Sequence, residues 1–360
     1  MSEDEKLRAL REKCTRFLQG HGPVSPAQML ATIPPGSQTD TYGDGGAVAE
    51  LETKIAELLG KPAAVFMPSG TMAQQSVLRV HADRRGRKTI LFHPMCHLDW
   101  HEEQGYQRLH GLIGRPVGDQ NLVMTLDQLG KVAEPPAALL IELPQRDLGG
   151  QQPAFDDLVA QARWARDRDA AVHMDGARLW ESAAGYGRSH AEIAALFDTV
   201  YVSFYKGIGA LPGCCVAGPE DVIGEVREWR RRMGGTLHGM WPSAASALTC
   251  LERRLPRFPG YLEHARAIAS ALSGLPGVRV IPDPPQVSMM HLLLKVTTED
   301  YQKAATRLAE EDAIWVQPKS ATTRDPAVQR LELSVGDATC ELAPRQVRDI
   351  VARLVGGEAG

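Results

Sequence analysis

Two residues near the middle of the chain have the types and spacing that amine chemistry requires. Lys206 lies in Val202-Ser203-Phe204-Tyr205-Lys206-Gly207 after an apolar run, and Asp175 ends another such run 31 positions upstream. A lysine at the end of a buried strand loses water, which lowers its pKa and leaves an amine able to attack a carbonyl. Either residue alone could be a surface lysine or a capping aspartate. The interval fits a strand, a crossover helix and a second strand, so the pair predicts one site.

This pair of side chains predicts pyridoxal 5'-phosphate as the cofactor, with Lys206 on the aldehyde and Asp175 on the pyridine nitrogen. Upstream, Ser69-Gly70-Thr71-Met72 follows the short apolar run Ala63–Met67 and opens a helix. The free N–H groups of a helix N-terminus bind anions. Although a serine N-cap is common on its own, together with Asp175 and Lys206 this segment is interpreted as the phosphate site.

A histidine-rich segment follows the predicted strand Thr89–Phe92. It contains His93, Cys96, His97 and His101, a set that could bind zinc. No second cluster of comparable spacing is present in the sequence, and the segment begins where a helix should start near the cofactor. We therefore expect no metal, and predict that one of these histidines lies flat on the cofactor ring.

The elements around these residues alternate between strands and helices, which predicts an α/β fold with a mostly parallel sheet and functional residues at the carboxyl ends of its strands. After about Leu251 the pattern changes to a long helix followed by shorter strands. The sequence therefore predicts an N-terminal helical arm (1–40), a large cofactor-binding domain (41–250) and a small C-terminal α+β domain (251–360).

Composition excludes several other classes of protein. The chain has 360 residues, 43% hydrophobic and 23% charged, with a formal net charge of −4, so nucleic acid is not an expected partner. The charged N-terminus lacks an export signal, and no 18-residue apolar run predicts a membrane span. Six cysteines without framework spacing fit reduced thiols. These features predict a cytoplasmic protein.

Further motifs extend this pattern over most of the chain, from about Tyr42 to Arg330. They are Tyr42-Gly43-Asp44, Pro68-Ser69-Gly70-Thr71-Met72, Cys96-His97-Leu98 with Glu102 downstream, Asp175-Gly176-Ala177-Arg178-Leu179, Lys206-Gly207 and Trp229-Arg230. Together they resemble the threonine aldolase group of fold-type I pyridoxal phosphate enzymes, a group that also contains β-eliminating lyases. The resemblance implies a fold-type I large domain and a homodimer or homotetramer.

The resemblance also implies individual roles. His97 would stack on the cofactor ring, and the Gly70 and Thr71 amides would hold the phosphate. Arg178, with Arg330 from the small domain, would bind the substrate carboxylate through its guanidinium fork. The implied cofactor-binding residues are Ser69, Gly70, Thr71, His97, Asp175, Arg178 and Lys206.

The substrate side departs from the family pattern. Gln145 stands where the family has a histidine near the substrate, and glutamine cannot act as a general base. His97, His101 or a phosphate-bound water are then the candidates to take a β-hydroxyl proton, and Lys206 is the third catalytic residue. We expect cleavage of a β-hydroxy-α-amino acid to glycine and an aldehyde. β-Elimination or other chemistry at the Cα–H bond remains an alternative, and a non-catalytic or zinc-binding protein a weaker one.

Overall fold

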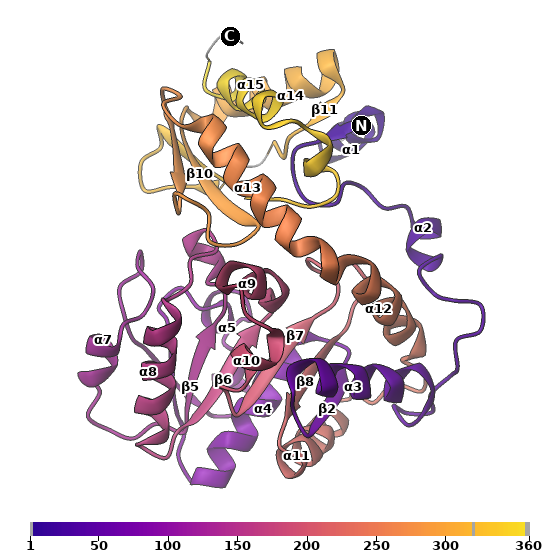
Figure 1. Cartoon of the computed structure of the whole chain (residues 1–360), viewed down its shortest axis with the longest axis vertical. Helices are drawn as coiled ribbons and strands as arrows, with labels where there is room; N and C mark the ends of the chain where they lie inside the picture. The colour runs from indigo at the N-terminus through magenta and orange to yellow at the C-terminus, as the bar shows by residue number, and fades with distance from the viewer. Residues whose placement is uncertain (1–2, 319–320, 357–360) are drawn as a thin grey trace. The chain divides into compact units, whose positions relative to one another are not determined.

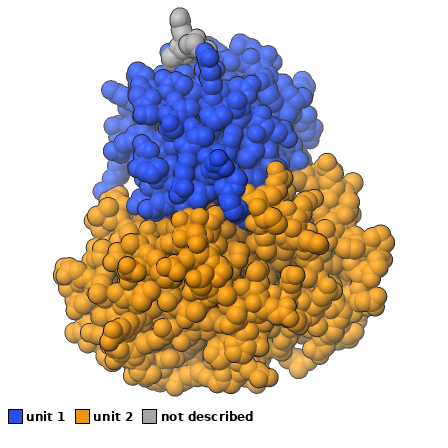
Figure 2. Space-filling model, viewed as in Figure 1, with its two compact units in different colours: residues 1–23, 149–151, 258–360 blue, residues 24–148, 152–257 orange. Residues whose placement is uncertain are grey.

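The computed structural model describes residues 3–318 and 321–356, which form two compact units (Figures 1 and 2). The large unit comprises residues 24–148 and 152–257, and the small unit comprises residues 1–23, 149–151 and 258–360. The division predicted from the sequence has different bounds. Residues up to 23 group with the C-terminal part of the chain, and residues 24–40 group with the large unit.

A seven-stranded sheet forms the centre of the large unit, in the order β2-β8-β7-β6-β5-β3-β4. The neighbouring pairs from β7 to β4 are parallel, whereas β8 runs antiparallel to both β2 and β7. The predicted α/β class with a mostly parallel sheet is confirmed. The strands are β2 (Ala63–Met67), β3 (Thr89–Phe92), β4 (Ile113–Pro116), β5 (Ala138–Glu142), β6 (Ala171–Gly176), β7 (Thr199–Ser203) and β8 (Cys214–Gly218).

Helices cover this sheet because alternate strand residues point to opposite faces. Ala138 and Leu140 of β5 join a buried cluster with α4 and α11. The helices of the large unit are α2 (Pro26–Leu30), α3 (Gly46–Leu59), α4 (Gly70–Arg85), α5 (His97–Trp100), α6 (Gly105–Arg108), α7 (Leu126–Gly130), α8 (Phe155–Arg166), α9 (Leu179–Tyr186), α10 (His190–Ala194), α11 (Glu220–Arg232) and α12 (Trp241–Arg254), with 3₁₀ turns η1 (Arg146–Leu148) and η2 (Leu255–Arg257).

The small unit contains an antiparallel sheet in the order β12-β13-β10-β9 and a parallel two-stranded sheet, β1-β11. Its strands are β1 (Arg16–Phe17), β9 (Val278–Ile281), β10 (Met289–Lys295), β11 (Ile314–Trp315), β12 (Ala321–Thr322) and β13 (Val328–Ser334). Its helices are α1 (Glu3–Lys13), α13 (Phe258–Leu272), α14 (Thr298–Asp312) and α15 (Pro344–Leu354), with the 3₁₀ turn η3 (Thr339–Glu341).

Within the predicted N-terminal helical arm, apolar residues at helical spacing favour one helix from residue 2 to about 20, and the structure differs from this. Helix α1 ends at Lys13, and β1 then pairs with β11. The apolar stripe of Leu7, Leu10, Cys14 and Phe17 packs against Trp315 and its neighbours within the small unit. This stripe is therefore covered by the chain itself. None of the helices within the described residues combines the length and apolar content that spanning a membrane requires.

Candidate active site

Adjacent parallel strands of the large unit bring the predicted site residues together. In the sheet register Glu142 at the end of β5 is opposite Asp175 on β6, and Asp175 is opposite Tyr201 on β7. Lys206 follows the end of β7 by three residues. The carboxyl ends of parallel strands meet at one edge, so residues far apart in sequence become neighbours there.

A cavity of about 240 Å³ lies at this edge of the sheet. Six predicted residues line it, namely Ser69, Gly70, Thr71, His97, Asp175 and Lys206, together with Pro68, Gln74, Glu102, Tyr201, Tyr205 and Pro212. The cavity thus combines an amine, two carboxylates, an imidazole and a helix N-terminus.

The start of α4 forms an anion site. The first N–H groups of a helix have no partner within the helix. Ser69 is extended at the N-cap and its side chain makes no capping hydrogen bond to them. A Cβ atom on Gly70 would collide with the phenol oxygen of Tyr201. The glycine therefore allows the helix end to approach β7 closely, and the positive end of the helix dipole meets the cavity.

The Lys206 amine is buried in the same cavity as Asp175. Burial lowers the pKa of the Lys206 amine, while the Asp175 charge opposes this shift and Arg178 adds to it. Asp175 is buried and its Oδ1 accepts a hydrogen bond from the Ala177 N–H at 3.1 Å. The site therefore holds a nucleophilic amine near a fixed buried carboxylate.

His97 is held by two carboxylates. Its backbone N–H donates to Glu142 Oε2 at 3.1 Å, and its ring Nδ1 lies 3.3 Å from Glu102 Oε1. The hydrogen bond to Glu102 raises the pKa of His97, against the effect of burial. Burial and the neighbouring Asp175 raise the pKa of Glu142 to about 7. Burial beside Asp175 therefore favours the protonated form of Glu142.

Four predicted residues do not line this cavity. His101 Nε2 lies 3.2 Å from Asp147 Oδ2, with its ring centroid 5.0 Å from that of His97. Gln145 is 4% exposed and donates to Met95 O and Glu142 Oε2. Arg178 caps α9, with its Nε 3.8 Å from Glu181 Oε1. Arg330 belongs to the small unit, on β13 opposite Leu293 of β10.

The histidine and cysteine segment is divided between different surroundings. His93 Nε2 lies 2.8 Å from the carbonyl oxygens of both Asp119 and Leu122, while the Cys96 thiol is buried and its pKa is raised by burial. Within the described part of the chain, no three His, Cys, Asp or Glu side chains gather closely enough to hold a metal ion.

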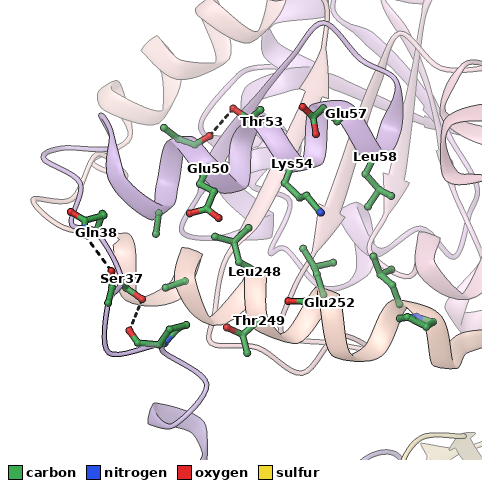
Figure 3. A pocket seen from close by; sticks show the side chains of 18 residues that line it. Ser37, Gln38, Glu50, Thr53, Lys54, Glu57, Leu58, Leu248, Thr249 and Glu252 are labelled. Atoms are coloured by element: carbon green, nitrogen blue, oxygen red, sulfur yellow. Dashed lines mark hydrogen bonds between the residues drawn. The ribbon is translucent and has the colours of Figure 1, made fainter.

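A larger groove of about 1120 Å³ lies elsewhere in the large unit, between α3 and α12 (Figure 3). Leu58 and Leu248 line it together with the exposed Glu50, Lys54 and Glu252. These are the solvated side chains of two helix surfaces, without the buried amine and carboxylate of the smaller cavity. The smaller cavity is therefore the candidate active site.

Several residues that form the site have no role assigned to them by the sequence pattern. Glu102 belongs to a motif without a predicted task, yet it is the ring partner of His97. Tyr201 and Gln74 line the cavity and belong to none of the motifs. Strand alternation could have indicated Tyr201, because it lies on β7 two residues before Ser203. Glu102 offers no comparable signal, since its position depends on the turn after α5.

The site fits pyridoxal phosphate. The cavity offers an amine for the aldehyde, a buried carboxylate for the pyridine nitrogen, and a helix N-terminus made accessible by Gly70 for the phosphate. Fold and site together define a fold-type I pyridoxal-phosphate-dependent enzyme.

Comparison with known proteins agrees with this class. Residues 24–296 match the beta-eliminating lyase family, and the chain belongs to that family. It is 28% identical over 251 residues to the low-specificity L-threonine aldolase 1 of Arabidopsis thaliana, covering 67% of this chain and 70% of the relative. It is likewise 28% identical over 239 residues to the low specificity L-threonine aldolase of Escherichia coli K12, covering 65% and 71%.

Two solved structures are similar over nearly the whole chain. A putative L-allo-threonine aldolase from Listeria monocytogenes EGD-E is 35% identical with a TM-score of 0.92, covering 98% of this chain and 99% of that one. A putative aromatic amino acid beta-eliminating lyase/threonine aldolase from Exiguobacterium sp. 255-15 is 38% identical with a TM-score of 0.91, with the same coverage.

Proposed function

We propose that the protein is a pyridoxal-phosphate-dependent aldehyde-lyase that cleaves a β-hydroxy-α-amino acid to glycine and an aldehyde. The observation that carries the proposal is the single cavity that joins Lys206, Asp175, His97 and the start of α4. The names of the relatives, threonine aldolases from a plant and a bacterium, support this substrate class.

Five residues of the cavity have a task in this reaction. Lys206 would bind the cofactor aldehyde, and the N–H groups of Gly70 and Thr71 would bind its phosphate. Asp175 would keep the pyridine nitrogen protonated, and His97 would lie against the ring. When bound, the cofactor supplies a sink for the electron pair left at Cα when a bond to that atom breaks.

Retro-aldol cleavage also requires a base for the β-hydroxyl proton. Gln145 cannot serve, because an amide has no usable basic atom and its Nε2 already donates to Met95 O and Glu142. His97 and His101 are the imidazoles available on α5 and at its end. We assign proton transfer to this pair.

The substrate carboxylate would be bound by guanidinium groups. Arg178 lies close enough to lower the pKa of Lys206. Arg330 is proposed as its second ligand from the small unit, on the resemblance of the chain to its family. Two forks would fix the substrate so that its Cα–Cβ bond is the one that breaks.

A second candidate reaction is β-elimination, or other chemistry that begins at the Cα–H bond. The absence of a base at position 145 favours this chemistry, because it needs no base for a β-hydroxyl proton and Lys206 itself could take the Cα proton. The name of the similar Exiguobacterium protein includes both activities.

A homo-oligomer, dimer or tetramer, is proposed because the large unit exposes several large apolar side chains, among them Leu30, Tyr42 and Leu237. The expected cytoplasmic location stays a prediction.

A product screen tests the proposed function. The purified holoenzyme is incubated with a panel of β-hydroxy amino acids of both configurations, and glycine, aldehyde, ammonia and keto acid are all measured. Glycine and aldehyde in equal amounts support the aldolase. Ammonia and keto acid without glycine would assign the protein to β-elimination.

A further inference from the structure

We propose that Glu102, itself held by Gln75, is a positioning residue that accepts the Nδ1–H of His97 and so directs the other ring nitrogen, Nε2, to the cavity. The inference rests on the proposed role of His97 in the reaction. It concerns the tautomer of one ring, which can be measured whether or not the substrate class is right.

The contacts around Glu102 form a short chain that leads away from the cavity. Glu102 Oε1 lies 3.3 Å from His97 Nδ1, and Gln75 Nε2 donates to Glu102 Oε2 at 3.2 Å. The Glu102 side chain is 1% exposed, and Gln75 is buried on α4. Each carboxylate oxygen thus has one partner, and the Glu102 Oε1 contact fixes the proton on Nδ1 because a carboxylate can only accept.

The turn that follows Glu102 has an uncommon backbone. Glu103 and Gln104 both have positive φ, 51° and 55°, in a region that non-glycine residues rarely occupy. A Cβ atom on Gly105 would collide with the amide of Gln75. Gly105 therefore allows this turn to approach Gln75, the partner of Glu102, closely. Backbone of this kind is often found at functional sites.

The charges that face His97 come from several elements. Glu102 raises the pKa of the ring most strongly, Asp175 of β6 raises it, and Lys206 after β7 lowers it. Glu142 of β5 accepts a hydrogen bond from the His97 backbone N–H, and the ring of His101 lies beside the ring of His97. Replacing the Glu102 carboxylate by an amide removes the largest favourable interaction of the protonated ring and leaves the other charges in place.

The experiment compares Glu102→Gln and Glu102→Leu with Glu103→Gln in the holoenzyme. Glu103 is the exposed neighbour on the same turn, so its variant is the matched control. Histidine-labelled protein is titrated by NMR, and the signal of His97 is assigned by its loss in His97→Phe. In wild type and in Glu103→Gln the neutral ring carries its proton on Nδ1. In Glu102→Gln, whose amide oxygen can still accept the Nδ1–H, we expect a fall in the His97 midpoint of about one pH unit or more because the charge is lost. In Glu102→Leu, which offers no acceptor, we expect the fixed Nδ1–H tautomer to be lost.

Activity provides the second readout. In Glu102→Leu, kcat falls by roughly 10²-fold or more because the nitrogen facing the substrate is no longer held as the basic one, while cofactor absorbance is unchanged. If Glu102→Leu does not fold, the His97 midpoint in Glu102→Gln decides. An unchanged His97 midpoint in Glu102→Gln, or an unchanged tautomer in a folded Glu102→Leu, overturns the inference.

The two proposals fail separately. If no β-hydroxy amino acid is cleaved by wild type, the proposed function is wrong and the tautomer measurement still decides the role of Glu102. If glycine is formed at the same rate by Glu102→Leu and Glu103→Gln, the aldolase stands and the positioning role is lost.

Discussion

Two lysines of the large unit show that the surroundings of an amine, and not burial alone, decide whether it can bind a carbonyl compound. Burial lowers the pKa of both Lys61 and Lys206. The Lys61 ammonium donates to the carbonyl oxygen of Phe197, outside the cavity, whereas Lys206 lies in the cavity with Asp175. Lys61 also lines a groove, of about 440 Å³, but of the two amines Lys206 is the one that shares its cavity with Asp175 and the start of α4.

We expect Lys206→Ala to lose covalent attachment of the cofactor while the fold is retained, because the position requires the amine for chemistry. Lys61→Ala is the matched control and should keep the attachment. Mass spectrometry after borohydride reduction should find the pyridoxyl group on Lys206 in wild type and in Lys61→Ala. A modified Lys61, Lys131 or Lys319 in its place would contradict the assignment.

Variants at His101 and Gln145 test which residue takes the β-hydroxyl proton. If His101 is the base, His101→Phe should lower kcat and kcat/KM together by roughly 10²-fold or more, with the cofactor spectrum unchanged. Its contact with Asp147 at 3.2 Å would orient the ring for this task. Normal glycine formation by this variant would exclude the role.

Gln145→His is assayed beside it, because this variant reintroduces an imidazole at the position where the family has one. The wild-type Gln145 side chain is buried against Glu142 and Met95. A large gain in glycine formation would show that retro-aldol cleavage is not the native reaction of this protein.

Among the elements, α4 has a close fit to the sheet at the site. Its first residue, Gly70, abuts the phenol of Tyr201 on β7, and its interior Gln74 lines the same cavity. The helix end therefore reaches the cofactor position only if residue 70 has no side chain.

Gly70→Ala should displace this helix end at a cost of roughly 1–3 kcal/mol, a loss of cofactor affinity of about 10–100-fold. Fluorescence titration with pyridoxal phosphate measures the effect. Tyr201→Phe in the same chain removes the colliding oxygen and should restore part of the affinity. The control is Gly224→Ala, in the middle of α11, where an added methyl group would enter open space and should leave cofactor binding unchanged.

A buried hydrogen-bonded chain joins α4 to β6 and β7. His173 Nε2 lies 2.6 Å from Gln74 Oε1 and its Nδ1 lies 2.8 Å from Thr199 Oγ1, which in turn lies 2.8 Å from His81 Nε2. Burial lowers the pKa of His173 to about 3. Both histidines are therefore neutral links between the helix and the sheet.

This burial predicts a pH dependence of stability. Between about pH 6.5 and 3 the unfolded state binds a proton at His173 that the folded state does not, so the free energy of unfolding falls with falling pH by up to about 1.4 kcal/mol per pH unit. Urea denaturation at about pH 7 and pH 5.5 should show a smaller decrease in His173→Gln than in wild type. The exposed His238→Gln should behave like wild type, and equal slopes in all three proteins would refute the prediction.

At the scale of the whole molecule, several large apolar side chains of the large unit are exposed. Tyr42 is 51% exposed with φ of 54°, packs edge-on to His238, and its N–H donates to His238 O. The neighbouring Leu237 is 48% exposed. The N-terminal stripe, in contrast, is buried within the small unit and gives no argument for a partner.

Light scattering at micromolar concentration should therefore find at least a homodimer. Leu237→Asp should shift the protein toward monomer, because a buried unpaired charge opposes an apolar contact. Leu122→Asp, at an exposed leucine in the loop before α7, is the control and should leave the assembly unchanged. A fully active wild-type monomer would contradict the proposal.

Much of the site follows from local sequence. Lys206, Asp175 and the Ser69-Gly70-Thr71 turn each lie at the end of an apolar run. Their strands β7, β6 and β2 run in the same direction, β2 by way of the antiparallel β8, so these ends meet at one edge of the sheet. Periodicity and end signals predict helices from about Asp221 to Arg232 and from Pro344 to Leu354, and α11 and α15 have nearly these bounds.

Contacts that depend on the path of the chain were decided only by the tertiary structure. The pairing of Glu102 with His97, and the two residues with positive φ that follow Glu102, were indicated by no pattern of residue types. The buried position of Gln145 depends on Met95, 50 residues away. Residues 14–23 join the small unit because β1 finds its partner in β11 almost 300 residues later. Periodicity reports which face of an element is apolar, and only packing of the whole chain selects the surface that covers it.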